Sequence, residues 1–318
     1  MTPEIPKQLL KSLAGLEGFN EKAFVEAHGE EHKITSIRFN PFKKTLPDFE
    51  LGEKVLWADD AWYLASRPSF THDPLFHAGC YYVQEAGSMF IEFALKNAVD
   101  LTQALKVLDL CGAPGGKSTL INSLLNGESL LVANELIKSR AGILVHNLAK
   151  WGTHNTIVTN NEAAKFGALT GFFDVLVIDA PCSGSGLFRK QPEAIAEWSE
   201  DNVNLCSTRQ QKILDETLPC LKENGILIYS TCSYSEKENE AIVKFLIETH
   251  GFEYLPLPVP PEWGIVDTGF GYRFYPHLLK SEGFFCAVLR KKKAEDLVYI
   301  TKKKSGLEAI PAPSAHER

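Results

Sequence analysis

Two cysteines stand just beyond two apolar segments of the chain. Cys182 follows residues 175–180 and a proline, and Cys232 follows residues 226–231. If these segments are neighbouring parallel strands, their carboxyl ends lie about 4.8 Å apart, and ligands of open α/β sheets bind beyond those ends. Cysteine supplies a nucleophile as a thiolate and also serves as an acid or base. The pattern therefore predicts one active site in which both thiols face the same substrate atom.

A carboxylate, Asp179, precedes the first of these cysteines in the sequence Asp179-Ala-Pro-Cys182. A cysteine nucleophile is suited to attack C6 of a pyrimidine when another group protonates or hydrogen-bonds N3, and we expect Asp179 to supply that group. After methyl transfer to C5, a base must remove the C5 proton, for which the second thiol is a candidate. A cysteine after a strand is most often a small core residue, but the polar residues around these two favour chemistry.

A glycine-rich loop links a predicted strand and helix and indicates a nucleotide-like cofactor. It comprises Cys111, Gly112, Ala113, Pro114, Gly115, Gly116 and Lys117. A phosphate-binding P-loop needs four residues between its first glycine and the Gly-Lys pair, whereas three residues separate Gly112 from Gly116. The loop also lacks the G-x-G-x-x-G spacing of nicotinamide sites, so S-adenosyl-L-methionine is the better candidate. Glu135 lies about 20 residues further on, where an acidic residue hydrogen-bonds the ribose diol of a bound nucleotide. The alternative is that Glu135 is an exposed acid at a strand end.

The order of apolar and amphipathic segments predicts an α/β fold with a doubly wound, Rossmann-like sheet and a smaller N-terminal α+β domain. Strands are expected at 105–110, 129–134, 156–159, 175–180, 226–230 and 284–290, and helices at 117–125, 139–151, 204–218 and 237–249. We expect an N-terminal domain over residues 1–99, a catalytic domain over 100–293 and a basic, flexible tail over 294–318. The sequence leaves open whether a further RNA-binding domain follows this tail in a longer protein.

Composition excludes several classes of protein. The 318 residues are 44% hydrophobic and carry a net charge of −7, which argues against a wholly basic nucleic-acid binder. Residues 290–318 nevertheless hold eight Lys and Arg against four acids, either as a solvated end or as a phosphate contact. Seven cysteines without a C-x-x-C pair indicate reduced thiols rather than disulfides or a metal. With no apolar stretch of membrane length and no secretion signal, we expect a cytoplasmic monomer without metal or membrane contacts.

Several motifs together resemble those of the Nop/Sun family of RNA (cytosine-C5) methyltransferases, in particular the bacterial branch that modifies ribosomal RNA. The resemblance covers nearly the whole chain. It is carried by residues 110–117 (LCGAPGGK), 179–186 (DAPCSGSG), 230–234 (STCSY) and 238–240 (ENE), and also by residues 36–40, 82–86, 189–192, 273–277 and 282–285.

This resemblance implies a division of roles that spacing does not supply. It assigns covalent attack on the cytosine to Cys232 and release of the product to Cys182. It also places the loop Cys111–Lys117, Glu135, Asp179 and Arg140 around S-adenosylmethionine. Family members usually have an aspartate at the position of Asn161, where the side chain contacts adenine; asparagine still donates and accepts hydrogen bonds there but lacks the charge.

The substrate implied is RNA, most simply ribosomal RNA, with transfer RNA as the alternative, and the product is 5-methylcytidine. Arg38, Arg189, Lys190, Arg273 and His277 are candidate RNA contacts, each equally compatible with an ordinary surface position. Phe188, Phe274 and Tyr234 are candidates to stack on an extruded base, with core packing as the alternative. Two other functions stay open, a non-catalytic RNA-binding or ribosome-assembly factor on the same fold and, less favoured, an NTPase.

Overall fold

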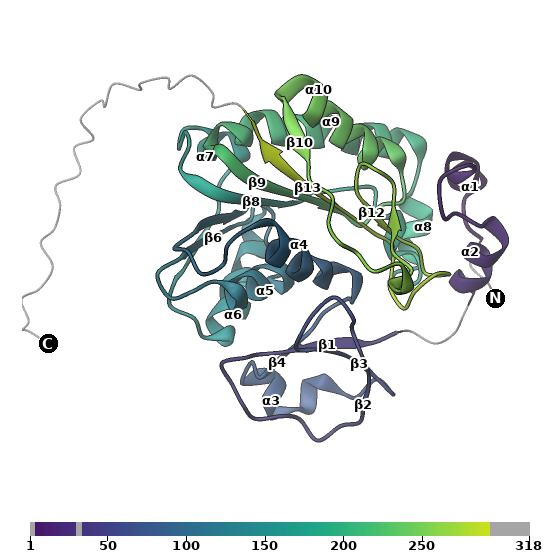
Figure 1. Ribbon diagram of the computed structural model, residues 1–318. Coiled ribbons are helices and arrows are strands. Elements are labelled where there is room, and N and C mark those ends of the chain that lie inside the picture. Colours follow the sequence, from purple (N-terminus) through teal and green to yellow (C-terminus); the bar gives the residue numbers. More distant parts are fainter. Residues whose placement is uncertain (1–3, 30–33, 293–318) are drawn as a thin grey trace, which may run out of the picture.

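The structure is a computed structural model that describes residues 4–29 and 34–292. It contains two β-sheets, a nine-stranded sheet covered by helices and a four-stranded sheet beside it (Figure 1). The predicted fold class is confirmed. The tail expected at 294–318 lies outside the described residues.

The large sheet is mixed. Its parallel strands are β5 (Lys106–Asp109), β6 (Leu130–Asn134), β7 (Thr156–Thr159), β8 (Phe173–Asp179) and β9 (Leu221–Thr231). The order along the sheet is β7-β6-β5-β8-β9 and then β13 (Phe284–Lys291), which is antiparallel to β9. Antiparallel β12 (Tyr272–Phe274) and β11 (Val266–Asp267) extend that side, and β10 (Phe252–Tyr254) also pairs with β13. All six strands predicted in this part of the sequence are present.

Helices cover both faces of this sheet, as its continuous apolar strands require. Val107 of β5 packs with α4 (Phe90–Ala98) and α5 (Gly116–Leu124), while its neighbour Leu108 packs with the layer of α7 (Ala163–Gly167), α9 (Glu200–Thr217) and α10 (Glu240–His250). Successive strand residues point to opposite faces, so one strand serves both cores. Helix α6 (Lys138–Trp151) packs on β6 through Leu144 and Leu148.

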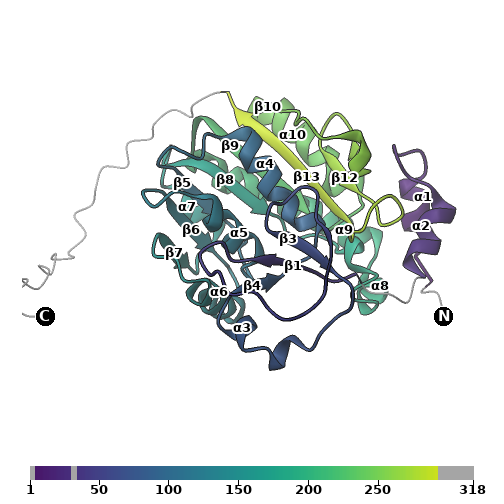
Figure 2. The ribbon, with the colours of Figure 1, turned by 60° about the horizontal axis from the view of Figure 1, so that its bottom comes forward.

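The small sheet is antiparallel, with the order β2 (Leu51–Lys54), β3 (Ala61–Leu64), β1 (Ser36–Phe39) and β4 (Tyr81–Val83). The short helix α3 (Pro74–His77) precedes β4. Figures 1 and 2 place this sheet next to α5 and α6. Helices α1 (Lys7–Leu13) and α2 (Glu21–His28) lie elsewhere, since Leu9, Leu13 and Phe24 pack against Phe188 and Tyr234 beside the large sheet.

The remaining elements are short and lie in the connecting loops. They are the helix α8 (Glu193–Glu197) and the 3-10 turns Phe70–His72, Gly87–Met89, Ser185–Leu187, Leu218–Cys220, Glu236–Glu238 and Pro261–Trp263. Among residues 4–29 and 34–292, no helix is long and apolar enough to cross a membrane.

Candidate active site

The two cysteines meet at the carboxyl ends of β8 and β9. The strands are parallel, and their register pairs Asp179 with Ser230. Because Cys182 and Cys232 follow that pair by three and two residues, the strands deliver both thiols to one place. Their Sγ atoms lie 3.1 Å apart. The hydrogen bond to Cys232, together with burial, raises the pKa of the Cys182 thiol well above its ordinary value.

Asp179 forms an ion pair with Lys117, with 2.9 Å between Oδ2 and Nζ. Its other oxygen accepts a 2.8 Å hydrogen bond from the Ser230 hydroxyl. Burial lowers the pKa of Lys117, but the charge and hydrogen bond of Asp179, together with the charges of Cys232 and Asp109, outweigh burial, and the pKa lies above its ordinary value. Lys117 is therefore a cation at neutral pH. A carboxylate and an ammonium thus stand together beside the two thiols.

A buried carboxylate, Glu238, ties the two cysteine loops together. It accepts hydrogen bonds from the backbone N–H and hydroxyl of Ser183, at 2.7 and 2.6 Å, and from the Ser233 hydroxyl at 2.5 Å. These serines directly follow Cys182 and Cys232. Burial raises the pKa of Glu238, although the serine hydrogen bonds act in the opposite direction. Glu238 therefore fixes the separation of the thiols without reaching into the site.

Two glycines allow a third loop to close on this pair. The N–H of Gly186 donates to the carbonyl of Cys232 at 2.9 Å, and the N–H of Gly283 donates to the carbonyl of Gly186 at 3.0 Å. A Cβ on Gly186 would lie 2.4 Å from the carbonyl oxygen of Gly283. Only glycine permits this approach of backbone to backbone.

An open cleft with a volume of about 290 Å³ lies in front of these groups. The glycine loop, Asp179 and Cys232 line one part, and residues from the β4 loop and the β13 loop line the rest. The sequence-predicted residues that line it are Cys111, Gly112, Ala113, Pro114, Gly116, Lys117, Arg140, Asp179 and Cys232.

The glycine loop leaves room for a ligand to approach its backbone. Gly115 adopts φ +115 at the start of α5, a conformation that favours glycine. A Cβ on Gly116 would fill space 3.4 Å from the ring of Tyr82. With a cation on either side, Lys117 and Arg140, this part of the cleft fits a cofactor that carries a carboxylate.

Three predicted cofactor residues, Gly115, Glu135 and Asn161, lie outside the cleft lining. The carboxylate of Glu135 accepts a hydrogen bond from the N–H of Ile137 at 2.9 Å and lies 3.4 Å from Arg140, which does line the cleft. Asn161 is exposed, and its backbone is held by the side chain of Asn134. Glu135 thus reaches the cleft through Arg140, whereas the side chain of Asn161 stands free at the surface.

Asp109 is a buried carboxylate beneath the glycine loop. It accepts a 2.6 Å hydrogen bond from Ser118 in the first turn of α5, and its other oxygen has no partner within the described residues. Burial raises the pKa of Asp109 to about 6. Burial also raises the pKa of the nearby Cys111 thiol, so this third cysteine stays protonated.

The structure corrects two of the expected RNA contacts. Arg38 is only 2% exposed and donates hydrogen bonds to Thr119 and to the carbonyl of Gly116. Arg273, also 2% exposed, is paired with Glu240 and donates to the carbonyl of Tyr234. Both are structural cations, because a surface charge pattern does not reveal which basic residues the fold encloses.

The aromatic residues proposed to stack on a base, Phe188, Phe274 and Tyr234, are likewise buried. His277 hydrogen-bonds the carbonyl of Gly18 at 3.0 Å, and Arg189 donates to the carbonyl of Ser281 at 3.4 Å. Lys190 alone among the five candidate basic residues is exposed and lines the cleft.

Sequence reasoning assigned no role to Glu238, Asp109 or Glu85, which hold the site together. Glu85 accepts hydrogen bonds from Gly87, Ser88, Ser281 and Glu282 and so ties the β4 loop to the β13 loop. The signals in the sequence were the positions of Glu238, within the motif 238–240, and of Glu85, within the motif 82–86.

The fold and site define an α/β protein in which an open cleft joins a glycine loop to the ends of two parallel strands that carry the thiols. The chain matches the family model "16S rRNA methyltransferase RsmB/F" over residues 97–290 and the model "N-terminal domain of 16S rRNA methyltransferase RsmF" over residues 5–86. The protein belongs to the RsmB/F family of 16S rRNA methyltransferases.

Curated relatives include proteins named ribosomal RNA small subunit methyltransferase F. The chain is 35% identical to that of Salmonella arizonae over 299 residues, which is 88% of this chain and 59% of the relative. It is 36% identical to that of Escherichia coli (strain K12) over 242 residues, which is 74% of this chain and 47% of the relative. The chain thus spans about half the length of these relatives.

Solved structures with the same fold come from Pyrococcus horikoshii. A methyltransferase homolog protein superposes with a TM-score of 0.71 at 26% identity, covering 90% of this chain and 100% of the other. NSun6 with SFG has a TM-score of 0.77 at 20% identity, covering 92% of this chain and 100% of the other, and shows the fold alone.

Proposed function

We propose that this protein methylates C5 of a cytidine in small-subunit ribosomal RNA, using S-adenosylmethionine. The observation that carries the proposal is the 3.1 Å separation of the Cys182 and Cys232 thiols, beside the Asp179–Lys117 ion pair and within reach of the glycine-loop cleft. C5 of cytosine is a poor nucleophile, and covalent attack at the neighbouring C6 is a way to activate it.

The cleft is the proposed cofactor site. Lys117 and Arg140 would hold the carboxylate of S-adenosylmethionine, and the backbone of Gly112 and Gly116 would lie against it. The bound cofactor supplies an electrophilic methyl group. Glu135, held by Arg140, is the proposed ligand of the ribose. A solved structure with the same fold, NSun6, contains the S-adenosylmethionine analogue SFG, which supports a cofactor of this class.

The proposed attack begins at Cys232. Its thiolate forms an S–C6 bond, and the π electrons of the C5–C6 double bond move toward C5 and N3. The Lys117 ammonium is the donor that meets the negative charge at N3, and the Asp179 carboxylate accepts a hydrogen bond from the exocyclic amino group. This refines the expectation that Asp179 protonates or hydrogen-bonds N3, because its oxygens already accept hydrogen bonds from Lys117 and Ser230.

The proposed release depends on Cys182. While Cys232 is free, its hydrogen bond raises the pKa of Cys182, which therefore stays protonated. Once the sulfur of Cys232 is bonded to C6, that cause is removed and the pKa of Cys182 falls, so Cys182 loses its proton to solvent and becomes a thiolate. It then takes the proton from methylated C5, the C5–C6 double bond re-forms, and the S–C6 bond breaks. The 3.1 Å contact between the two thiols therefore matters in both steps, because it keeps Cys182 protonated before attack and releases it once Cys232 is bonded to C6.

The direct test uses small ribosomal subunits from cells that lack this protein, labelled S-adenosylmethionine and the purified chain. We expect label at a cytidine with the wild type and with Cys80→Ala, a buried cysteine outside the site, and none with Cys232→Ala. Bisulfite sequencing identifies the position. Methylation by Cys232→Ala would remove this residue from the role of nucleophile, and RNA binding without methylation by the wild type would favour an assembly factor.

A further inference from the structure

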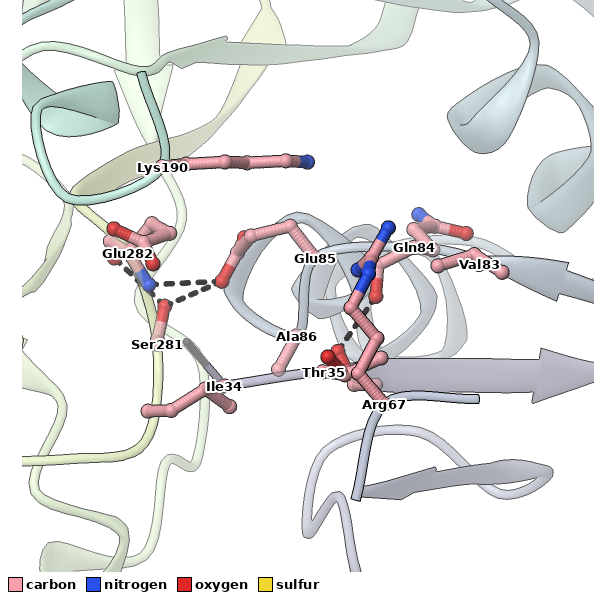
Figure 3. A pocket seen from close by; sticks show the side chains of 11 residues that line it. Ile34, Thr35, Arg67, Val83, Gln84, Glu85, Ala86, Lys190, Ser281 and Glu282 are labelled. Atoms are coloured by element: carbon pink, nitrogen blue, oxygen red, sulfur yellow. Dashed lines mark hydrogen bonds between the residues drawn. The ribbon is translucent and has the colours of Figure 1, made fainter. Parts of the chain in front are cut away.

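A second, smaller pocket adjoins the cleft. It has a volume of about 60 Å³ and shares Val83, Gln84, Glu85, Lys190 and Glu282 with the cleft. Its other walls are residues 34–36, which lead into β1, and Arg67, Ala86 and Ser281. Figure 3 shows the pocket between loops of the large sheet and loops of the small sheet. A ligand that extends from the cleft past these shared residues therefore reaches this pocket.

The size of the pocket limits what it can hold. Sites for whole small molecules commonly measure about 300–1,000 Å³. A pocket of about 60 Å³ accommodates a few atoms only. It therefore fits part of a larger ligand whose remainder lies in the neighbouring cleft, as a polynucleotide strand does.

Two cations stand at the mouth of the pocket, one from each part of the molecule. Lys190 extends across it from the loop after β8, and Arg67 reaches toward it from the segment after β3 (Figure 3). Both are exposed, and within the described residues neither has a carboxylate at ion-pair distance. The guanidinium of Arg67 lies 5.3 Å from the ring of Phe70, which limits its motion. The pair fits a phosphate at the mouth.

The interior of the pocket is neutral or acidic rather than basic. Glu85 there is saturated by hydrogen bonds from Gly87, Ser88, Ser281 and Glu282. The Oγ1 atom of Thr35 is buried and has no hydrogen-bond partner within the described residues. An unpartnered buried hydroxyl costs about 1–3 kcal/mol, which a ligand hydroxyl would offset. A ribose 2′-hydroxyl both donates and accepts, and it distinguishes RNA from DNA.

We propose that this pocket receives the ribose 2′-hydroxyl of the nucleotide adjacent to the target cytidine, on Thr35, while the phosphate of that nucleotide lies at the mouth between Lys190 and Arg67. The inference rests on the proposed function for the placement of the target base in the cleft. It adds a substrate subsite shared between the N-terminal sheet and the catalytic domain.

The test measures binding of a short single-stranded RNA that contains the target cytidine, by fluorescence anisotropy over a range of salt concentrations. For Arg67→Gln and Lys190→Gln we expect affinity to fall about three- to tenfold and the slope against log salt to fall by about 0.7, the value for one lost phosphate contact. Lys212→Gln, a matched change on the exposed face of α9, should leave both unchanged. Wild-type affinity and slope in the Arg67→Gln/Lys190→Gln double variant would overturn the proposal.

The position of the adjacent nucleotide in the complex is tested with modified RNA. A neutral methylphosphonate at a phosphate flanking the cytidine should weaken binding to the wild type but not further weaken binding to the double variant. A 2′-deoxy nucleotide at that position should weaken binding to the wild type and not to Thr35→Val. Penalties that persist in the variants would contradict the assignment. Because these are binding measurements, they fail independently of cytidine methylation, which is measured separately.

Discussion

The guanidinium of Arg38, in β1 of the small sheet, donates a 2.7 Å hydrogen bond to Oγ1 of Thr119 in α5, the helix that opens at the glycine loop. It also donates to the carbonyl of Gly116 at 3.3 Å and lies 4.5 Å from the ring of Trp151. The small sheet is thus bonded directly to the proposed cofactor loop. Burial lowers the pKa of Arg38 to about 10, so it is charged at neutral pH.

Replacement of Arg38 by alanine should destabilise the protein and weaken cofactor binding together. It leaves buried oxygens of Thr119 and Gln84 without their donor, which costs about 2–4 kcal/mol in the free energy of unfolding. Urea denaturation and calorimetric titration with S-adenosylmethionine measure the two effects. Arg209→Ala, an exposed arginine on α9, is the control. A fully stable Arg38→Ala protein would show that the contact carries no energy.

Glu238→Gln should slow methyl transfer about 100-fold without a change in S-adenosylmethionine affinity. The amide replaces an oxygen that accepts from Ser183 or Ser233 with a donor, so the two cysteine loops shift, and small misplacements of reacting groups have effects of this size. Single-turnover kinetics isolate the chemical step. The neighbouring Glu236→Gln, at an exposed position, should behave as the wild type. Equal activity of the two variants would argue against a positioning role for Glu238.

Cys182→Ala should accumulate a covalent complex with RNA. Attack by Cys232 does not require the second thiol, whereas removal of the C5 proton does in the proposed scheme. Denaturing gel electrophoresis with labelled RNA measures the adduct, which should be absent from Cys182→Ala/Cys232→Ala. Free turnover by Cys182→Ala without an adduct would assign release to another group.

Asp109 predicts a loss of stability with rising pH. The pKa of Asp109 is about 6 in the folded protein, where burial disfavours the charge, whereas the ordinary value, taken for the unfolded chain, is 3.8. Between these two pKa values the unfolded chain has lost the proton while the folded protein keeps it. The free energy of unfolding therefore falls from about pH 4 to pH 6, and above pH 6 Asp109 causes no further change. The largest loss in the free energy of unfolding from this residue is on the order of 3 kcal/mol. Asp109→Asn should flatten this decline, measured by thermal unfolding, whereas the exposed Asp48→Asn should not.

Two glycine substitutions should have opposite signs. A Cβ on Gly186 would lie 2.4 Å from the carbonyl oxygen of Gly283 and 2.8 Å from that of Cys232, so Gly186→Ala should destabilise by about 1–3 kcal/mol and reduce activity. Gly142 lies in α6 with nothing within 4 Å of its Cβ position, so Gly142→Ala should stabilise by about 0.5–1 kcal/mol. Denaturant titration compares them. An unchanged free energy of unfolding in Gly186→Ala would mean that the loops move apart at this contact without cost.

Local pattern predicted the strands well because a parallel sheet covered on both faces needs continuous apolar segments, as in residues 226–230 and 284–290. It predicted the proximity of Cys182 and Cys232 because strand ends in one sheet share an edge. It did not distinguish Arg38 and Arg273 from surface cations, since their burial depends on Thr119 and Glu240, which lie 81 and 33 residues away along the chain.

The sequence by itself determined six of the nine strands of the large sheet, the cysteine pair beyond β8 and β9 and the glycine loop before α5, because each follows from short-range periodicity and residue type. Only the tertiary structure decided which carboxylates hold the site and where the small sheet lies. Glu238 bridges two loops that are 50 residues apart at their cysteines, and Glu85 bridges the β4 and β13 loops. Such contacts form between segments with no mutual signal in the sequence, and burial and hydrogen bonding select them only once the chain has folded.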